Sequence, residues 1–506
     1  MIARSPGSER HATARVASGP VAAVAAVIAV IAATLTVGVT AAGDLRLIEA
    51  VRAKNAERIR ALIAERVDVN ARQGDQATAL HWAAHLDDGA AVDLLLRAGA
   101  RADVADDTGA TPLYLACVNG NAEVVTKLLD AGADAKTSLL SGETALMTCA
   151  RSGSAAAVRA MLRRGAVVNA RESAHNQTAL MWAAAESHPD VVAALLEGGA
   201  DVRARSREYT QTVTSEVTQR AGREELNYTV PRGGSTALLF AARSGDAEST
   251  RLLVAAAADV NDALPDGTSA LILAAHSGHT RTAEMLLDKG ANPNAGAVGY
   301  TPLHAAVLRS DLALVKALLV HGANPNAPIT KGTPVRRNSE DFELPKTLIG
   351  ATPYLLAAKF LEADIMRALA AGGADTRMRM KDGATPLMAA AGMGIVAPAQ
   401  DEKRGTDRRG LAILDGGIVE PESRVLEAVT TALTLGSDID ATNPSGETAL
   451  HIASAQGYDT VVSTLVARGA NLNARNTKGQ TPLGALVERK SRPRTIELLR
   501  KLGAGI

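Results

Sequence analysis

The chain has little cysteine, few aromatic residues and no net charge, and each shortage excludes a class of protein. Cys117 and Cys149 are its only cysteines, which are too few for a disulfide-stapled fold or a zinc site built on thiolates. Basic and acidic residues each number 54, so we expect no overall attraction to nucleic acid or anionic lipid. Aromatic residues make up 2% and hydrophobic residues 47% of the chain. A core must therefore be built from Ala, Leu and Val.

Sequence signatures of catalysis are also missing. The chain contains no glycine-rich nucleotide loop, no His-Glu-x-x-His helix, no Cys-x-x-Cys pair and no Gly-x-Ser-x-Gly elbow. We therefore expect a protein that is not an enzyme and holds no cofactor.

One long apolar run is present, near the amino terminus. Arg4, Arg10 and Arg15 precede an uncharged stretch over residues 21–39, small residues follow, and Asp44 begins a charged composition. This order is typical of a cleaved signal peptide. A signal anchor is the alternative, because about 20 apolar residues also span a bilayer. In both interpretations of residues 1–43, the rest of the chain lies on the exported side of the membrane.

A short signature recurs through the rest of the chain. A Thr or Ser, followed by Ala or Pro and then Leu or Tyr, begins at residues 78, 111, 144, 178, 236, 269, 301, 352, 385, 448 and 481. Most steps are 32 to 34 residues long, and three longer steps contain insertions of 25, 18 and 30 residues. A degenerate copy begins near Leu45. The sequence therefore predicts twelve structural repeats within residues 44–506.

The residues of each repeat predict two short helices. Thr111 suits a helix N-cap and Pro112 the first helical position, and Gly120 ends that helix. A second amphipathic segment follows, and Gly132 suits its left-handed end. Two units depart from this pattern: alanines replace the glycine-bearing helix end at residues 255–258, and the unit from Thr385 loses its turn between helices. We expect these two to be the least regular.

These units resemble the ankyrin repeat. The closest matches are the helix start Thr301-Pro302-Leu303-His304, the turn Ser277-Gly278-His279 and the segment His321-Gly322-Ala323-Asn324-Pro325-Asn326. The resemblance covers essentially residues 45–506 and implies an all-α repeat solenoid of helix-turn-helix units with short hairpin tips. It also implies a single domain that binds other proteins.

Several residues invite a chemical interpretation that the resemblance weakens. His81 and His85 are four residues apart and could share a metal, but His81, His304 and His451 occupy the position of the family's structural histidine. Trp82 and Trp182 follow that position and are better explained by packing than as a stacking platform. Cys117 and Cys149 lie in consecutive first helices, and packed helices stand about 8–10 Å apart. We therefore expect two free, buried thiols and no metal site.

The concave face of such a solenoid is its usual binding surface, again by resemblance. The first-helix column, seven or eight residues after each signature, contains His85, Asn119, Arg151, Glu186, Arg243, His276, Arg309, Lys359 and Phe360. The middle of this column is mostly basic. One hypothesis is that it docks an acidic protein surface or an anionic ligand; the alternative is a solvated face whose charges are compensated nearby.

The three insertions, near residues 206–234, 328–350 and 394–421, are candidate binding loops. The first is β-branched between Tyr209 and Tyr228 and could extend a hairpin finger. The second carries Arg336, Arg337 and Phe342, and the third carries Arg408 and Arg409. Tolerated, disordered insertion is the alternative for all three.

Together these observations predict a non-catalytic scaffold on the exported side, periplasmic or secreted, or else anchored by one membrane span. We expect a monomer that binds a partner protein of unknown identity through its concave face and hairpin fingers, without binding nucleic acid. An enzyme or anionic-ligand receptor assembled by the insertions, and a secreted effector that binds host proteins, remain as alternatives.

Overall fold

A computed structural model describes residues 44–219, 222–331, 348–392, 413–414, 417–418 and 421–506. The expected signal segment therefore lies outside the described residues. Contacts divide the chain into two compact units, one ending at Leu140 and the other running from Ser141 to Ile506.

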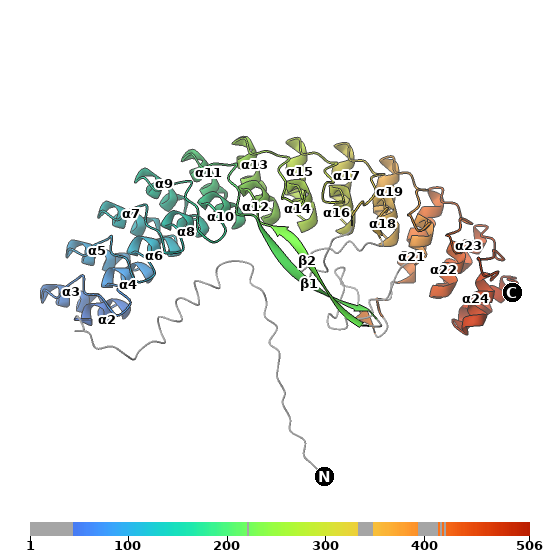
Figure 1. Ribbon diagram of the computed structural model, residues 1–506, viewed down its shortest axis with the longest axis horizontal. Coiled ribbons are helices and arrows are strands. Elements are labelled where there is room, and N and C mark those ends of the chain that lie inside the picture. The colour runs from blue at the N-terminus through green and yellow to red at the C-terminus, as the bar shows by residue number, and fades with distance from the viewer. Residues whose placement is uncertain (1–43, 220–221, 332–347, 393–412, 415–416, 419–420) are drawn as a thin grey trace, which may run out of the picture. The chain divides into compact units, whose positions relative to one another are not determined.

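The first unit contains three helix pairs among its described residues (Figure 1). They are α2 (Arg46–Arg52) with α3 (Ala56–Ala64), α4 (Ala79–His85) with α5 (Gly89–Arg97), and α6 (Pro112–Asn119) with α7 (Ala122–Asp130).

The described part of the second unit contains nine helix pairs, so the expected total of twelve repeats is confirmed. The pairs are α8 (Ala145–Arg151) with α9 (Ala155–Arg163), α10 (Ala179–Ala185) with α11 (Pro189–Glu197), α12 (Ala237–Ser244) with α13 (Ala247–Ala255), α14 (Ala270–Ser277) with α15 (Thr280–Asp288), α16 (Pro302–Leu308) with α17 (Leu312–Val320), α18 (Pro353–Lys359) with α19 (Ala363–Ala371), α20 (Pro386–Ala390) with α21 (Glu422–Thr434), α22 (Ala449–Gln456) with α23 (Asp459–Ala467), and α24 (Pro482–Arg489) with α25 (Pro493–Lys501).

The helix boundaries follow from the residues at the ends. The Thr111 hydroxyl accepts a hydrogen bond from the Tyr114 N–H at 3.2 Å, and Pro112 begins α6. Gly120 ends α6 with a φ of 67°. Small and aliphatic side chains such as Leu113 and Ala116 are fully buried between the helices. Ala, Leu and Val predominate in this core as expected, and the aromatic residues Tyr114, Trp182, Tyr300 and Tyr354 are buried in it as well.

One of the two units expected to be irregular is regular. Helix α13 has nine residues, like its neighbours, and Ala257 adopts a φ of 66° where other repeats place a left-handed glycine such as Gly290. The unit from Thr385 is irregular as expected: α20 has five residues and α21 has thirteen. The third insertion lies between them, and its described part contains the short antiparallel pair β3 (Ile413–Leu414) and β4 (Gly417–Ile418).

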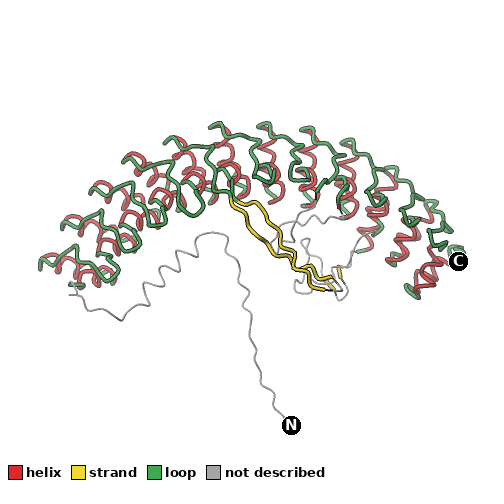
Figure 2. The backbone as a smooth tube through the Cα atoms, viewed as in Figure 1, coloured by secondary structure: helices red, strands yellow, loops and turns green. Residues whose placement is uncertain are grey.

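The first insertion forms the expected hairpin. Strands β1 (Tyr209–Gln219) and β2 (Gly222–Arg232) pair antiparallel from Tyr209 opposite Arg232 to Gln219 opposite Gly222. Figure 2 shows this ribbon leaving the helical repeats beside α12. Most of the second insertion, including residues 332–347, lies outside the described residues.

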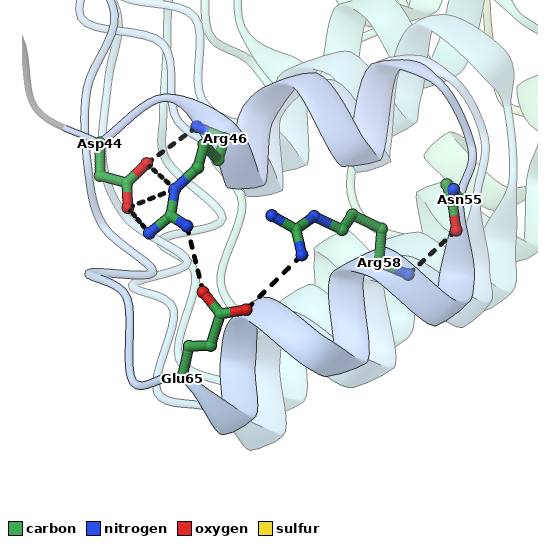
Figure 3. A network of polar contacts seen from close by, with 5 residues as sticks. All are labelled: Asp44, Arg46, Asn55, Arg58 and Glu65. Atoms are coloured by element: carbon green, nitrogen blue, oxygen red, sulfur yellow. Dashed lines mark hydrogen bonds and ion pairs between the residues drawn. The ribbon is translucent and has the colours of Figure 1, made fainter.

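The first repeat carries a charged network on its surface (Figure 3). Arg46 bonds both carboxylate oxygens of Asp44 and reaches Glu65 at 3.1 Å, and Arg58 meets the other Glu65 oxygen at 3.5 Å. The carboxyl pKa of Asp44 is lowered, chiefly by its hydrogen bond from the Arg46 side chain. Asn55 caps α3 by accepting from the Arg58 N–H at 2.9 Å. Exposed charges of this kind keep a terminal repeat soluble.

The cysteine prediction is wrong. Cys117 and Cys149 are both disulfide-bonded, and no cysteine among the described residues is free. The error came from using the spacing of helix axes as the spacing of residues. A Cα atom lies about 2.3 Å from its helix axis, so residues on facing sides are several ångströms closer than the axes are.

Candidate functional site

The first-helix column is used partly for contacts between neighbouring repeats. Asn119 donates through Nδ2 to the carbonyl oxygens of Ala84 and His85, each at 2.9 Å. Arg309 donates through Nε to the His276 carbonyl at 2.5 Å. In each case the side chain bonds a carbonyl at the end of the preceding first helix, where an α-helix leaves its last carbonyls without the usual bond from four residues further on. These two predicted binding residues therefore also hold the stack together.

Arg151 belongs to a half-buried cluster. Its Nη2 lies 3.3 Å from Glu143 Oε1, and only 14% and 15% of the two side chains is exposed. The guanidinium carbon lies 4.8 Å from the centre of the Trp182 ring, within cation–π range. Trp182 is itself buried and donates to Gln177 at 2.8 Å. The expectation that Trp182 is a packing residue is confirmed.

The other column residues differ in exposure. Glu186 and Arg243 are exposed, whereas His85, His276, Lys359 and Phe360 are half-buried. Burial lowers the pKa of both His85 and Lys359. His276 Nδ1 lies 3.2 Å from the Tyr300 hydroxyl. In the second unit, Glu186 and Arg243 are therefore the exposed residues of the column.

The three histidines at the family's structural position hold one shared geometry. His81, His304 and His451 each place Nδ1 beside the N-cap threonine of their own helix and Nε2 beside a backbone carbonyl of the next repeat. Because both ring nitrogens are occupied in this way, the structural interpretation is confirmed for all three. Burial lowers the pKa of each.

The base of the β1–β2 hairpin is held by several bonds, and we call residues 205–207 and 233–235 the hairpin root. Ser206 N–H donates to the Ser235 carbonyl at 2.9 Å, and Ser235 N–H donates to the Ser206 hydroxyl at 3.0 Å. Arg207 N–H donates to the His175 carbonyl in the preceding inter-repeat turn at 2.6 Å. Gly233 has a φ of 76°, and a Cβ there would lie 1.8 Å from the Arg207 carbonyl oxygen.

Arg205 joins the hairpin root to the following repeat. Its Nη1 donates to the Gly234 and Ala263 carbonyls at 2.7 and 3.2 Å, and its Nη2 bonds Asp262. The other Asp262 oxygen accepts from the Thr236 hydroxyl at 2.6 Å. Asp262 and Thr236 are buried. The root is therefore bonded to the repeats on both of its sides.

Neighbouring repeats are also joined by a recurring bond from one turn position. The side-chain oxygen at this position accepts a backbone N–H of the next repeat at 2.7–2.8 Å, and the residues concerned are Asn70, Asn169, Asn261, Asn294, Asn326, Asp440 and Asn473. Arg203 occupies this position just before the hairpin. It makes no such bond to a described residue of the next repeat.

A cavity of about 530 Å³ opens where this bond is missing. Arg203, Arg205, Asp259 and Asp262 contribute two charges of each sign to its lining, and small residues such as Ala257 leave the space. Sequence reasoning missed this place. The signal was present, because Arg203 departs from the Asn or Asp found at most equivalent positions.

Of the remaining predicted site residues, two belong to the hairpin and the others lie outside the described residues. Tyr209 is 48% exposed at the start of β1. Tyr228 pairs with Val213 in the ladder of the hairpin. Arg336, Arg337, Phe342, Arg408 and Arg409 lie outside the described residues.

The described residues bear on the alternatives in two ways. They contain no cluster of three or more His, Cys, Asp or Glu side chains suited to a metal ion. Among the described helices, none combines the length and the apolar character needed to cross a membrane.

Comparison with known proteins identifies the repeats. A family model described as ankyrin repeats (3 copies) matches residues 47–138, 132–206, 222–297, 238–329 and 422–506, and a second, ankyrin repeats (many copies), matches residues 180–254. The B-cell lymphoma 3 protein homolog of Mus musculus is 30% identical over 229 residues, covering 40% of this chain and 50% of the relative. The chain thus matches about half the length of that curated relative.

A solved structure is also similar. The crystal structure of the human ASB11 ankyrin repeat domain is 26% identical, with a TM-score of 0.39, and the match covers 49% of this chain and 98% of that one.

Proposed function

Because the chain belongs to the ankyrin repeat family, we propose that it is a non-catalytic scaffold that binds a partner protein on the exported side of a membrane. Ankyrin repeats indicate a scaffold for protein–protein interaction. The exported location and the particular binding surface are our proposal.

The proposed surface lies in the second unit and combines the exposed first-helix residues Glu186 and Arg243 with Tyr209 at the start of the hairpin. The observation that carries it is the hairpin root, which is bonded to the preceding repeat through His175 and to the following one through Asp262 and Ala263. A protruding element held from both sides loses little conformational freedom on binding, which favours affinity.

Two observations support export. The apolar stretch over residues 21–39 follows three arginines, as in signal peptides and signal anchors. Both cysteines are disulfide-bonded, and disulfides persist in oxidising compartments outside the cytosol.

The binding surface is tested by capture from the exported fraction of the native source with three forms of the full chain. These are the parent, Arg243→Glu on α12 and Arg251→Glu on α13 of the same repeat. We expect a specific partner to be retained by the parent and R251E and lost by at least tenfold with R243E. Equal retention by R243E and R251E, or equal loss, would contradict a surface at the first-helix ends.

The location is tested separately by fractionation and protease treatment of sealed membranes. Export predicts that the repeats are recovered outside the cytosol, and a mature amino terminus near Asp44 would indicate cleavage. Retention with the membrane after an alkaline wash, with the full amino terminus, would indicate the anchor. Recovery in the cytosol would overturn the proposed location.

A further inference from the structure

The β1 edge of the hairpin is unpaired. Strands β1 and β2 form a two-stranded sheet of eleven residues each, and the outer edge of β1 pairs with no other described strand. Figure 2 shows the pair as a ribbon that extends away from the helical repeats. A two-stranded ribbon is marginally stable alone, and a free edge offers a row of main-chain donors and acceptors to another strand.

Pro231 fixes which main-chain groups face outward. Proline has no N–H, so within a sheet it occupies positions whose N–H would not enter the ladder. Pro231 pairs with Thr210. We call a position outward when its main-chain N–H and C=O point away from the paired strand. Outward and inward positions alternate along an antiparallel pair. The outward positions of β1 are therefore Thr210, Thr212, Thr214, Glu216 and Thr218.

The two edges differ in how well they are protected. The outward positions of β2 include Arg223, Glu225 and Pro231, and charged residues and proline are the usual devices that prevent edge pairing. The outward positions of β1 carry one charge, Glu216, and otherwise only threonine. The β1 edge is therefore the one open to a further strand.

We infer that this further strand is β1 of a second copy of the chain, which pairs antiparallel with the first about Thr214. In that register Thr214 meets its own copy, Thr210 meets Thr218, and Glu216 meets Thr212. No like charges are opposed, and paired threonines are favourable across strands. A two-fold interface requires a strand that is complementary to itself in this way.

The resulting sheet has four strands in the order β2, β1, β1 and β2, with the two β1 strands at its centre. Antiparallel pairing places the two hairpin roots at opposite ends of the central pair, about 34 Å apart at about 3.4 Å per residue. This inference replaces the expectation of a monomer and does not depend on the proposed partner surface.

The test compares two proline variants of the full chain by analytical ultracentrifugation. Thr212 and Thr229 face each other in the ladder, and both occupy outward positions. Thr212→Pro removes a donor from the β1 edge, and Thr229→Pro removes the matched donor from the β2 edge. We expect the parent and T229P to be dimers and T212P to dimerise at least tenfold more weakly.

A monomeric parent at micromolar concentrations would overturn the inference. Equal dissociation of T212P and T229P would also overturn it, because loss of the ribbon itself would then explain the result.

A second pair of variants tests the register. A cysteine introduced by Thr214→Cys stands opposite its own copy, so mild oxidation is expected to give a covalent dimer. Asn227→Cys, which faces Thr214 within one hairpin, is expected to give none. The native cysteines do not compete, because both are already disulfide-bonded. Crosslinking through N227C and not T214C would place the contact on the other edge and refute the inference.

Discussion

His304 is bonded twice to Thr301, the residue that caps its helix. Its Nδ1 accepts from the Thr301 N–H at 3.1 Å and lies 2.8 Å from the Thr301 hydroxyl. Its Nε2 lies 3.3 Å from the Ala351 carbonyl of the next repeat, so this nitrogen carries the proton of the neutral ring. A second proton on Nδ1 would face the Thr301 donor and remove an acceptor.

This geometry predicts a loss of stability in mild acid. Burial lowers the pKa of His304 to about 4, whereas an unfolded histidine titrates near 6.5. The unfolded chain therefore binds the proton first, so the stabilisation is present above pH 6.5 and is lost as the pH falls towards 4. The difference corresponds to roughly 3 kcal/mol for this residue. Urea unfolding at stepped pH measures it.

The control is another histidine. His304→Gln should reduce the pH dependence over this range, whereas His175→Gln, at an exposed position in the turn before α10, should change it less. An unchanged slope in H304Q would show that His304 does not control the acid response.

A left-handed alanine predicts a stabilising substitution. Ala257 has a φ of 66°, a conformation that costs a residue with a Cβ about 1 kcal/mol relative to glycine. Ala257→Gly should therefore raise the free energy of unfolding by about 1 kcal/mol or slightly less. Gly290→Ala, the reverse change in the next repeat at a φ of 89°, should lower it by a similar amount. Shifts of the same sign in both variants would be inconsistent with backbone strain as the cause.

The cluster around Trp182 predicts a coupled pair. Arg151→Ala removes both the partner of the half-buried Glu143 carboxylate and the cation over the ring, and should destabilise the protein by about 2 kcal/mol. The double variant with Glu143→Ala should cost less than the two single changes added together. Lys501→Ala breaks an exposed pair with Glu497 and should change stability by less than about 1 kcal/mol. Strict additivity at Glu143 and Arg151 would argue against direct coupling.

The disulfide state predicts a simple thiol count. The native protein, unfolded without reductant, should show no free thiol, and two should emerge per chain after reduction. Two thiols before reduction would restore the original expectation from sequence and would also remove one support for export.

The repeats were predictable because their signals are local. A cap such as Thr111, a first-turn proline and a left-handed glycine act within one helix, and eleven signatures in phase repeat the evidence. The hairpin was also within reach, since the run from Tyr209 is rich in β-branched residues. The register of the hairpin could not be predicted in the same way, because register depends on the facing strand and on Pro231.

The contacts between repeats could not be derived in the same way. Nothing in the sequence near Arg309 shows that its guanidinium meets the His276 carbonyl, a residue 33 positions earlier. The same holds for Arg205 with Asp262, and for the cysteines, where a general helix spacing gave the wrong answer. The sequence therefore predicted where the basic side chains of the column begin, but it did not predict which of them bond to the neighbouring repeats.

The ribbon is much longer than the base by which the hairpin root holds it. The root is clamped to consecutive repeats, whose helices stand about 10 Å apart, whereas the ribbon is about 34 Å long. A slight change of twist between the α10–α11 and α12–α13 pairs would swing the far end of the ribbon about three times as far as it moves the root. A bend of the stack between these two pairs would therefore be visible chiefly as a displacement of the far end of the ribbon.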